Sequence, residues 1–326
     1  MKYKILRLLK KREGFISGES ISKEFGVTRA AIWKSINSLK EDGYKIESIT
    51  NKGYRLLSSP DILTCEEIGE YLNTRFIGNN IYYYDSIDST NKMAKDIAFE
   101  KGEGVVIVSE EQLEGRGRLG RTWVSPKKKG IYFSIVLKPQ LPPTKIAKLT
   151  LIGAAAVNLA FKEIGIESQI KWPNDIVING KKVCGILTEM NSELNMINYV
   201  IIGIGINVNL KENEIPEDIK HKATSLKIES KGEIDRKRLF ATILNKFEEL
   251  YIPFNDDGDI VKTIEICRNN SAVIGKEILL VNGSTKSLGK ALDINEAGEL
   301  IVEFEDGKIE SIFSGEISIR GLEGYI

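Results

Sequence analysis

The sequence is poor in the residue types that most catalytic and metal sites use. Among its 326 residues there is one histidine, His221, and there are three cysteines, far apart: Cys65, Cys184 and Cys267. A single histidine argues against histidine-based catalysis and against sites with several histidine ligands. Three distant cysteines argue against a disulfide framework and a paired-cysteine metal site, and they fit a reducing compartment. We therefore expect a cytoplasmic protein with no metal cage of its own.

The sequence also lacks any run of 18 apolar residues, which argues against a membrane span. Its N-terminus, MKYKILRLLKKREGF, has charge on both sides of a short apolar stretch, unlike a secretory signal. The hydrophobic content of 42% and the charged content of 28% are those of a globular protein. The length predicts two or three domains.

A net charge of zero conceals an asymmetry along the chain. Residues 1–60 have 13 Lys and Arg against 6 Asp and Glu, which leaves 33 against 40 for the remainder. A basic segment on a slightly acidic body predicts contact with a polyanion. The alternative is a solvated surface face.

The basic segment has the spacing of three short helices. Gly26 supplies a tight turn between the second and third helices, and Thr28 is a candidate N-cap for the third. Apolar residues form one stripe on each helix: Ile5, Leu6, Leu8 and Leu9 on the first, Ile21 and Phe25 on the second, and Ile32, Ile36 and Leu39 on the third. Two helices around a glycine turn predict a helix-turn-helix.

An alternating stretch around Asn51-Lys52-Gly53 then predicts a hairpin, which would form a wing. The third helix would enter the major groove of DNA. The candidate DNA contacts are Thr28, Arg29, Lys34, Ser35 and Ser38 on this helix, with Lys52 and Arg55 on the wing. Such a domain can instead serve only for protein docking. Pro60 lies in a linker, SSPDIL, so we place the boundary near residue 62.

The middle of the chain contains a loop in which Gly115, Gly117 and Gly120 alternate with Arg116, Arg118 and Arg121. Its glycines match the dinucleotide fingerprint formally, but no helix follows them, so we reject that interpretation. Glycines allow close approach to a ligand and arginines grip phosphate, so the loop suits a nucleotide. The alternative is an RNA-binding or solvated turn.

Three further motifs surround this loop in the sequence. Asp88-Ser89-Thr90-Asn91 begins a predicted helix, where it would cap the helix or hold a polar ligand head. Lys171-Trp172-Pro173-Asn174-Asp175 precedes a hairpin that turns at Asn179-Gly180, and Lys182 on its return strand would project a positive charge into a pocket. Gly203 and Gly205 lie in an apolar strand, where they would let a flat ligand pack on the sheet.

The motifs DSTN, EEQLEGRGRLGRTW, KWPND, KKVCGIL and GIGIN occur in this order behind a winged helix. In this combination the chain closely resembles the bifunctional biotin protein ligases that double as biotin operon repressors. The resemblance implies an α+β multidomain fold with a winged helix-turn-helix at 1–62 and a mixed-sheet catalytic domain of the biotinyl/lipoyl ligase type at 63–270. It also implies a C-terminal SH3-like β-barrel at 271–326, where the residues show short strands with turns.

The resemblance further implies a two-step reaction in which biotin and ATP give biotinyl-5′-adenylate and pyrophosphate, and a lysine of a biotin carboxyl carrier domain then takes the biotin. It assigns catalysis to Lys182, Arg116 and Arg118. It assigns biotin binding to Ser89, Thr90, Asn91, Gln112, Gly115, Arg116, Lys182, Gly185 and Gly203. It assigns ATP and adenylate binding to Arg118, Arg121, Trp123, Asn174, Asp175, Asn207 and Arg320.

The resemblance implies Mg²⁺ as the companion of ATP, and the implied partners are a carboxyl carrier domain of acetyl-CoA or pyruvate carboxylase and the operator DNA of biotin genes. It also implies a homodimer in the adenylate-bound state and no association with membranes. Two alternatives stay open. One is a ligase whose N-terminal domain no longer represses, and the other is a lipoate or octanoate ligase or a non-catalytic ligand sensor.

Overall fold

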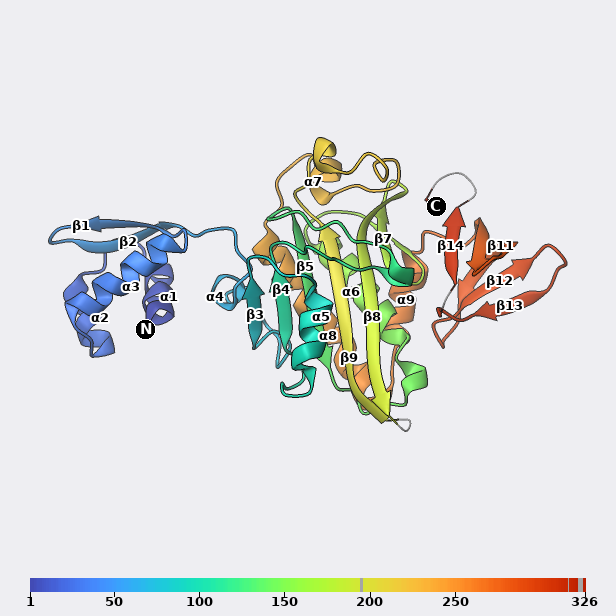
Figure 1. Ribbon diagram of the computed structural model, residues 1–326, viewed down its shortest axis with the longest axis horizontal. Helices are drawn as coiled ribbons and strands as arrows, with labels where there is room; N and C mark the ends of the chain where they lie inside the picture. Colours follow the sequence, from blue (N-terminus) through green and yellow to red (C-terminus); the bar gives the residue numbers. More distant parts are fainter. Residues whose placement is uncertain (194–195, 316, 322–324) are drawn as a thin grey trace. The chain divides into compact units, whose positions relative to one another are not determined.

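The computed structural model describes residues 1–193, 196–315, 317–321 and 325–326, and it separates into two compact units, residues 1–62 and 63–326. The smaller unit has three helices and a hairpin (Figure 1). The helices are α1 (Lys2–Lys11), α2 (Gly18–Phe25) and α3 (Arg29–Glu41), and the hairpin strands are β1 (Lys45–Ile49) and β2 (Gly53–Ser58). The predicted helix-turn-helix is therefore confirmed.

Local signals in the sequence account for the element ends in this unit. Ser17 and Thr28 accept hydrogen bonds from the backbone N–H groups of Ser20 and Ala31, which caps α2 and α3. Gly26 ends α2 in the left-handed conformation, at φ 63°. The apolar stripes meet in one core, which contains all the predicted stripe positions of α1 and α3 together with Ile16, Ile21, Tyr44 and Ile46.

The larger unit is built on a mixed seven-stranded sheet of order β3-β4-β5-β9-β8-β7-β6. Only β3 and β4 are parallel, and the other neighbours are antiparallel. The strands are β3 (Ile81–Tyr84), β4 (Val106–Ser109), β5 (Gly130–Leu137), β6 (Gln169–Lys171), β7 (Asp175–Ile178), β8 (Lys181–Glu193) and β9 (Met196–Asn207).

Helices cover both faces of this sheet (Figure 1). On one face α6 (Lys148–Glu163), α8 (Arg236–Asp257) and α9 (Val261–Asn269) share the main hydrophobic core with the strands. On the other face α5 (Thr90–Ala98) packs Ala94 and Ala98 against Ile107 and Ile201. The short helices α4 (Cys65–Ile68) and α7 (Leu226–Ser230) lie outside these layers.

One segment, Pro143–Glu163, is long and apolar enough to cross a membrane, and 67% of its most apolar window is buried inside the fold. The segment contains α6, whose alanine-rich sequence packs against α8 and the sheet. A core helix needs the same composition, because it is apolar all round when it is buried all round.

The chain ends in a five-stranded antiparallel sheet of order β13-β12-β11-β10-β14. Its strands are β10 (Glu277–Asn282), β11 (Thr285–Ile294), β12 (Leu300–Phe304), β13 (Ile309–Ile312) and β14 (Ser318–Gly321). The predicted all-β ending and the α+β class are thus confirmed. Its apolar residues join the core of the central sheet, and Trp172 donates a 3.0 Å hydrogen bond from Nε1 to the carbonyl of Gly298.

Candidate active site and nucleic-acid interface

A platform of glycines on the central strands forms the floor of the candidate site. Gly185 of β8 and Gly205 of β9 lie opposite each other in register. A Cβ atom at Gly205 would lie 2.5 Å from Nε1 of Trp123, and one at Gly185 would lie 3.1 Å from the same indole. The flat group that lies on these glycines is therefore a side chain of the Arg/Gly loop itself.

The loop that carries Trp123 folds as a short antiparallel ladder over the platform. Gly117 N–H donates to the carbonyl of Arg121 at 2.7 Å, and Trp123 N–H donates to the carbonyl of Gly115 at 2.8 Å. Gly115 packs against the backbone of Trp123 within the loop, where a Cβ atom would lie 2.4 Å from the Trp123 carbonyl oxygen. It is not among the residues that line the cavity. The indole Nε1 is buried and has no hydrogen-bond partner among the described residues. An unpaired buried donor favours a state in which the indole moves or meets a ligand.

One end of the cavity is polar and enclosed. Gln112 Oε1 accepts hydrogen bonds from the backbone N–H of Thr90 at 2.9 Å and from its hydroxyl at 3.1 Å, while Gln112 Nε2 donates to Ser125 Oγ at 3.0 Å. Ser89 occupies the N-cap position of α5, but its side chain makes no capping hydrogen bond. These buried or half-buried groups form the kind of end wall that suits a polar ligand head.

A second row of polar groups behind this wall was not found from the sequence. Ser134 of β5 donates to Thr90 Oγ1 at 2.8 Å and contacts Asn91 Oδ1 at 2.6 Å. Glu189 of β8 accepts from Asn91 Nδ2 at 2.7 Å and pairs with Lys95 at 2.6 Å. A signal for Ser134 existed, since it is the one polar side chain besides Tyr132 in the buried strand Gly130–Leu137, GIYFSIVL.

The position of Asn91 explains Gly203. A Cβ atom at Gly203 would lie 2.1 Å from Asn91 Oδ1, so this glycine makes room for the asparagine side chain. Glu189 holds the amide so that its oxygen faces Ser134. Both Gly203 and Asn91 line the cavity, so the glycine also leaves backbone exposed to a ligand.

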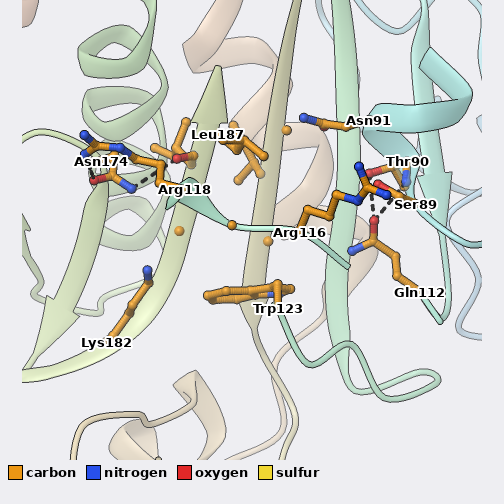
Figure 2. Close-up of a pocket in the computed structure, with 16 residues that line it drawn as sticks. Ser89, Thr90, Asn91, Gln112, Arg116, Arg118, Trp123, Asn174, Lys182 and Leu187 are labelled. Atoms are coloured by element: carbon orange, nitrogen blue, oxygen red, sulfur yellow. Dashed lines mark hydrogen bonds between the residues drawn. The ribbon is translucent and has the colours of Figure 1, made fainter. Parts of the chain in front are cut away.

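Positive charges stand around the polar end and the platform (Figure 2). The side chain of Arg116 points toward Thr90 and Gln112, and Lys182 extends from β8 toward Trp123. Lys182 Nζ lies 2.6 Å from Asp175 Oδ1 and 5.3 Å from the centre of the Trp123 ring. The cavity between these groups is about 50 Å³, far below the roughly 300–1,000 Å³ of ligand pockets. Trp123 occupies the glycine platform, so we expect this side chain to move when a ligand binds there.

A larger groove of about 900 Å³ continues from this cavity. Arg118 reaches across it and donates to Asn174 Oδ1 at 2.8 Å and to the carbonyls of residues 314, 315 and 317 at 2.6–3.2 Å. Asn207 lines the groove and donates from its amide to the carbonyl of Thr224. Arg121, Trp123, Asp175 and Arg320 line the groove as well, together with His221. The predicted nucleotide residues are thus gathered around one groove.

Lys171 and Tyr325 also line this groove, and neither is among the site residues predicted from the sequence. Lys171 Nζ donates to the carbonyl of Tyr325 at 2.7 Å and lies 3.4 Å from the centre of its ring. The Tyr325 hydroxyl donates to Asp175, so the carboxylate is held from two sides, by Lys182 and Tyr325. Burial lowers the pKa of Lys171 to about 8, and Asp175 only partly offsets that effect.

The candidate DNA residues of the smaller unit divide into exposed and engaged groups. Thr28, Arg29, Lys34 and Lys52 are exposed. The prediction that Ser35 faces outward is wrong: it is 9% exposed and donates to the carbonyl of Ala31 at 2.9 Å. Arg55 is half-buried and pairs with Glu47 at 2.6 Å, and Ser38 is half-buried.

Comparisons with known proteins agree with this arrangement. Residues 2–55 match the HTH domain family, residues 83–207 the "Biotin/lipoate A/B protein ligase family", and residues 273–320 the "Biotin protein ligase C terminal domain". The chain is 40% identical over 308 residues to the "Bifunctional ligase/repressor BirA" of Bacillus subtilis (strain 168), which covers 94% of each chain.

The chain belongs to the family of bifunctional biotin ligase/repressors. The protein of the same name from Escherichia coli (strain K12) is 28% identical and covers 98% of this chain and 97% of its own length. Among solved structures, the biotin protein ligase of Aquifex aeolicus in complex with biotin and ATP matches with a TM-score of 0.66 and 33% identity. It covers 74% of this ligase/repressor and 99% of the Aquifex chain.

Proposed function

We propose that this chain is an ATP-dependent biotin protein ligase that also represses biotin genes. Residues 63–270 carry the chemistry, residues 271–326 complete the nucleotide groove, and residues 1–62 bind DNA. The observation that carries the proposal is the single path from the polar wall of Thr90 and Gln112, across the glycine platform, to the cation-lined groove. A ligand with a polar ring at one end and a carboxylate at the other fits this path.

In the first step, a biotin carboxylate oxygen would form a bond to the α-phosphorus of ATP, and the bond to pyrophosphate would break. Both reactants are anions, so their approach needs positive charge that persists into the transition state. Lys182 stands where the platform meets the groove, which suits a bridge between carboxylate and α-phosphate. Arg116 on the biotin side and Arg118 on the nucleotide side would neutralise the remaining charge. Alignment of the two bound substrates would supply much of the rate.

In the second step, the ε-amine of an acceptor lysine would attack the carbonyl carbon of biotinyl-5′-adenylate. The bond to AMP would break, and the amine would lose a proton as the amide forms. We assign the acceptor to a biotin carboxyl carrier domain, because two relatives carry the name "Biotin--[acetyl-CoA-carboxylase] ligase", which points to such an acceptor. Trp123 would then leave its present place and cover the adenylate.

We propose that Mg²⁺ enters with ATP. Among the described residues, no group of three His, Cys, Asp or Glu side chains is close enough to hold a metal ion. The groove offers the carboxylates of Asp175 and Asp218, which would supply the protein's share of the ligands. The ion would reduce the negative charge of the phosphates, while the side chains of Lys182 and Arg118 would orient the nucleotide for attack by the carboxylate.

We further propose a cytoplasmic homodimer that forms when the adenylate is bound and that binds an operator of two half-sites. A ligand that binds the dimer more tightly than the monomer must promote dimerisation. Sedimentation of the full chain with biotin, with ATP and with both checks this, and we expect the dimer mainly with both. Equal dimerisation in all three samples would contradict adenylate as the signal.

The test of the chemistry is mass spectrometry of the protein mixed with biotin, ATP and magnesium chloride, with lipoate in a parallel sample. We expect the protein to retain biotinyl-adenylate and the lipoate sample to contain no adenylate. Adenylate from lipoate alone would assign the chain to lipoate ligation. No adenylate in either sample would make it a sensor without chemistry.

A further inference from the structure

Trp33 on α3 is the most exposed of the three tryptophans. It is 60% exposed, whereas Trp172 is 1% exposed and Trp123 lies half-buried on the glycine platform. A single exposed apolar side chain is common on proteins and proves nothing alone. The surroundings of Trp33 on the helix decide what this one does.

Trp33 is exposed on the predicted recognition helix, at the side of its buried stripe. The stripe is Ile32, Ser35, Ile36 and Leu39. The helix neighbours of Trp33 one turn earlier are Arg29 and Ala30, both exposed, and Lys34 beside it is exposed too. The sequence of α3 contains no acidic residue before Glu41. Arg29 forms an ion pair with Glu19 of α2 at 3.6 Å, and both side chains are exposed.

This face is complementary to a DNA duplex in charge and in size. α3 has 13 residues, so it is about 20 Å long, and the major groove of about 12 Å admits one helix. Recognition helices meet base edges mainly with their N-terminal residues. Trp33 lies about one turn from the capped N-terminus, and Ala30 beside it is too small to hold it away from a surface.

We propose that Trp33 reads the operator by recognising thymine in the major groove. An indole offers an apolar face and one N–H donor, with no acceptor. Among the four bases, thymine alone presents a methyl group next to an acceptor, its O4, in that groove. The cations beside Trp33 bind phosphates and give affinity for any sequence, whereas the indole gives preference for one base. This inference rests on the DNA-binding part of the proposed function.

The probe is a duplex selected from a random library by the full chain in the presence of biotin, ATP and magnesium chloride. Its affinity is compared with that of a scrambled duplex at several salt concentrations, for the wild type, Trp33→Ala, Trp33→Phe and Lys34→Ala. We expect Trp33→Ala to weaken the selected duplex by about 10- to 100-fold, with unchanged binding of the scrambled duplex and an unchanged salt slope. Lys34→Ala is the matched control and should weaken both duplexes and lower the salt slope by about one.

Replacing thymine by uracil removes the methyl group and keeps O4. At one thymine of each half-site, uracil should weaken the wild type but leave Trp33→Ala unchanged, which is the mark of a direct contact. The Trp33→Phe protein should keep part of the methyl preference. Because Trp33 is exposed, we expect its variants to fold and to biotinylate normally, which the adenylation assay checks on the same samples.

Several outcomes would overturn the proposal. Trp33→Ala with wild-type affinity for the selected duplex would remove Trp33 from recognition. Equal weakening on both duplexes with a smaller salt slope would make it a backbone contact. If the wild type selects no duplex at all, both this proposal and the repressor function are wrong, and the exposed indole then serves a protein partner.

Discussion

At the scale of single residues, we expect Lys182 to be the charge on which adenylation depends most. It lies between the platform and the groove, and its ion pair with Asp175 holds it there at 2.6 Å. We expect Lys182→Ala to fold normally and to lose about 10²–10³-fold in adenylation, the cost of removing one fixed group that stabilises transition-state charge. Pyrophosphate release from biotin and ATP measures it. Lys181→Ala, an exposed lysine of the same strand, is the control, and near wild-type release by Lys182→Ala would remove Lys182 from the mechanism.

We expect Lys171 to make ATP binding depend on pH. Its pKa is about 8 in the free protein because the side chain is buried. A bound polyanion favours the charged form and raises that pKa, so binding takes up a proton above pH 8 and affinity falls as the pH rises. We expect the Kd for ATP, without biotin, to be flat below about pH 7 and to increase by up to about tenfold per pH unit above 8.

The matched variants for this pH effect are Lys171→Arg and Lys171→Met. The arginine stays charged throughout, so its ATP affinity should not change over this range. The methionine has no charge to lose, so its affinity should be weak at every pH. Calorimetric titration at several pH values measures all three proteins. A wild-type profile that matches that of Lys171→Arg would mean that another group, or none, titrates.

At the scale of elements, the Arg/Gly loop is anchored from behind the sheet. Arg236, the first residue of α8, donates from one nitrogen to Glu110 Oε2 at 2.7 Å and to the carbonyl of Gly130 at 2.9 Å. Glu110 precedes the loop and Gly130 follows it, so one guanidinium ties both ends of residues 110–130. Both charged side chains are fully buried. The loop residues that we expect to contact substrate therefore depend on the Glu110–Arg236 ion pair, although neither of these two residues lines the cavity.

We expect Glu110→Gln to lower the free energy of unfolding by about 3–5 kcal/mol, because it removes the buried carboxylate with which the buried Arg236 pairs. The double variant Glu110→Leu with Arg236→Met should regain much of that stability, since it removes both charges. It should still have a raised KM for biotin, because the loop ends are no longer tied together. Urea unfolding and adenylation kinetics separate the two effects. Recovery of both stability and KM in the double variant would show that the pair is only structural.

Local signals predicted the elements of this chain well, and they failed where contacts cross long stretches of sequence. Thr28, Gly26 and Asn179-Gly180 mark their helix ends and turn by short-range chemistry. The contacts of Arg118 with residues 314, 315 and 317 and of Lys171 with Tyr325 span more than 150 residues. Tertiary packing brings these residues together, so no periodicity in the sequence predicts the contacts. Ser35 was misassigned because its polar side chain outweighed its place at i+3 of the buried stripe.

At the scale of the whole molecule, we expect the two compact units to divide the two activities between them. The boundary falls at residues 62 and 63, and the smaller unit has its own hydrophobic core. Every residue that lines the cavity and the groove belongs to the larger unit. The larger unit therefore contains the complete candidate site for adenylation, and the smaller one contains all the candidate DNA contacts.

We expect deletion of residues 1–62 to abolish binding of the selected duplex and to leave the KM for biotin within about twofold of the full chain. The physical reason is that the deletion removes the basic helix and wing but touches none of the groups around the platform. Gel shift with the duplex and pyrophosphate release measure the two activities on the same preparation. The control is the full chain with Lys34→Ala, Lys52→Ala and Trp33→Ala. This variant keeps residues 1–62 and removes only side chains that we expect to face DNA. Duplex binding by the truncated chain would contradict the assignment of DNA binding to residues 1–62. Loss of adenylation in the truncated chain, but not in the triple-substituted control, would show that the smaller unit supports the catalytic one.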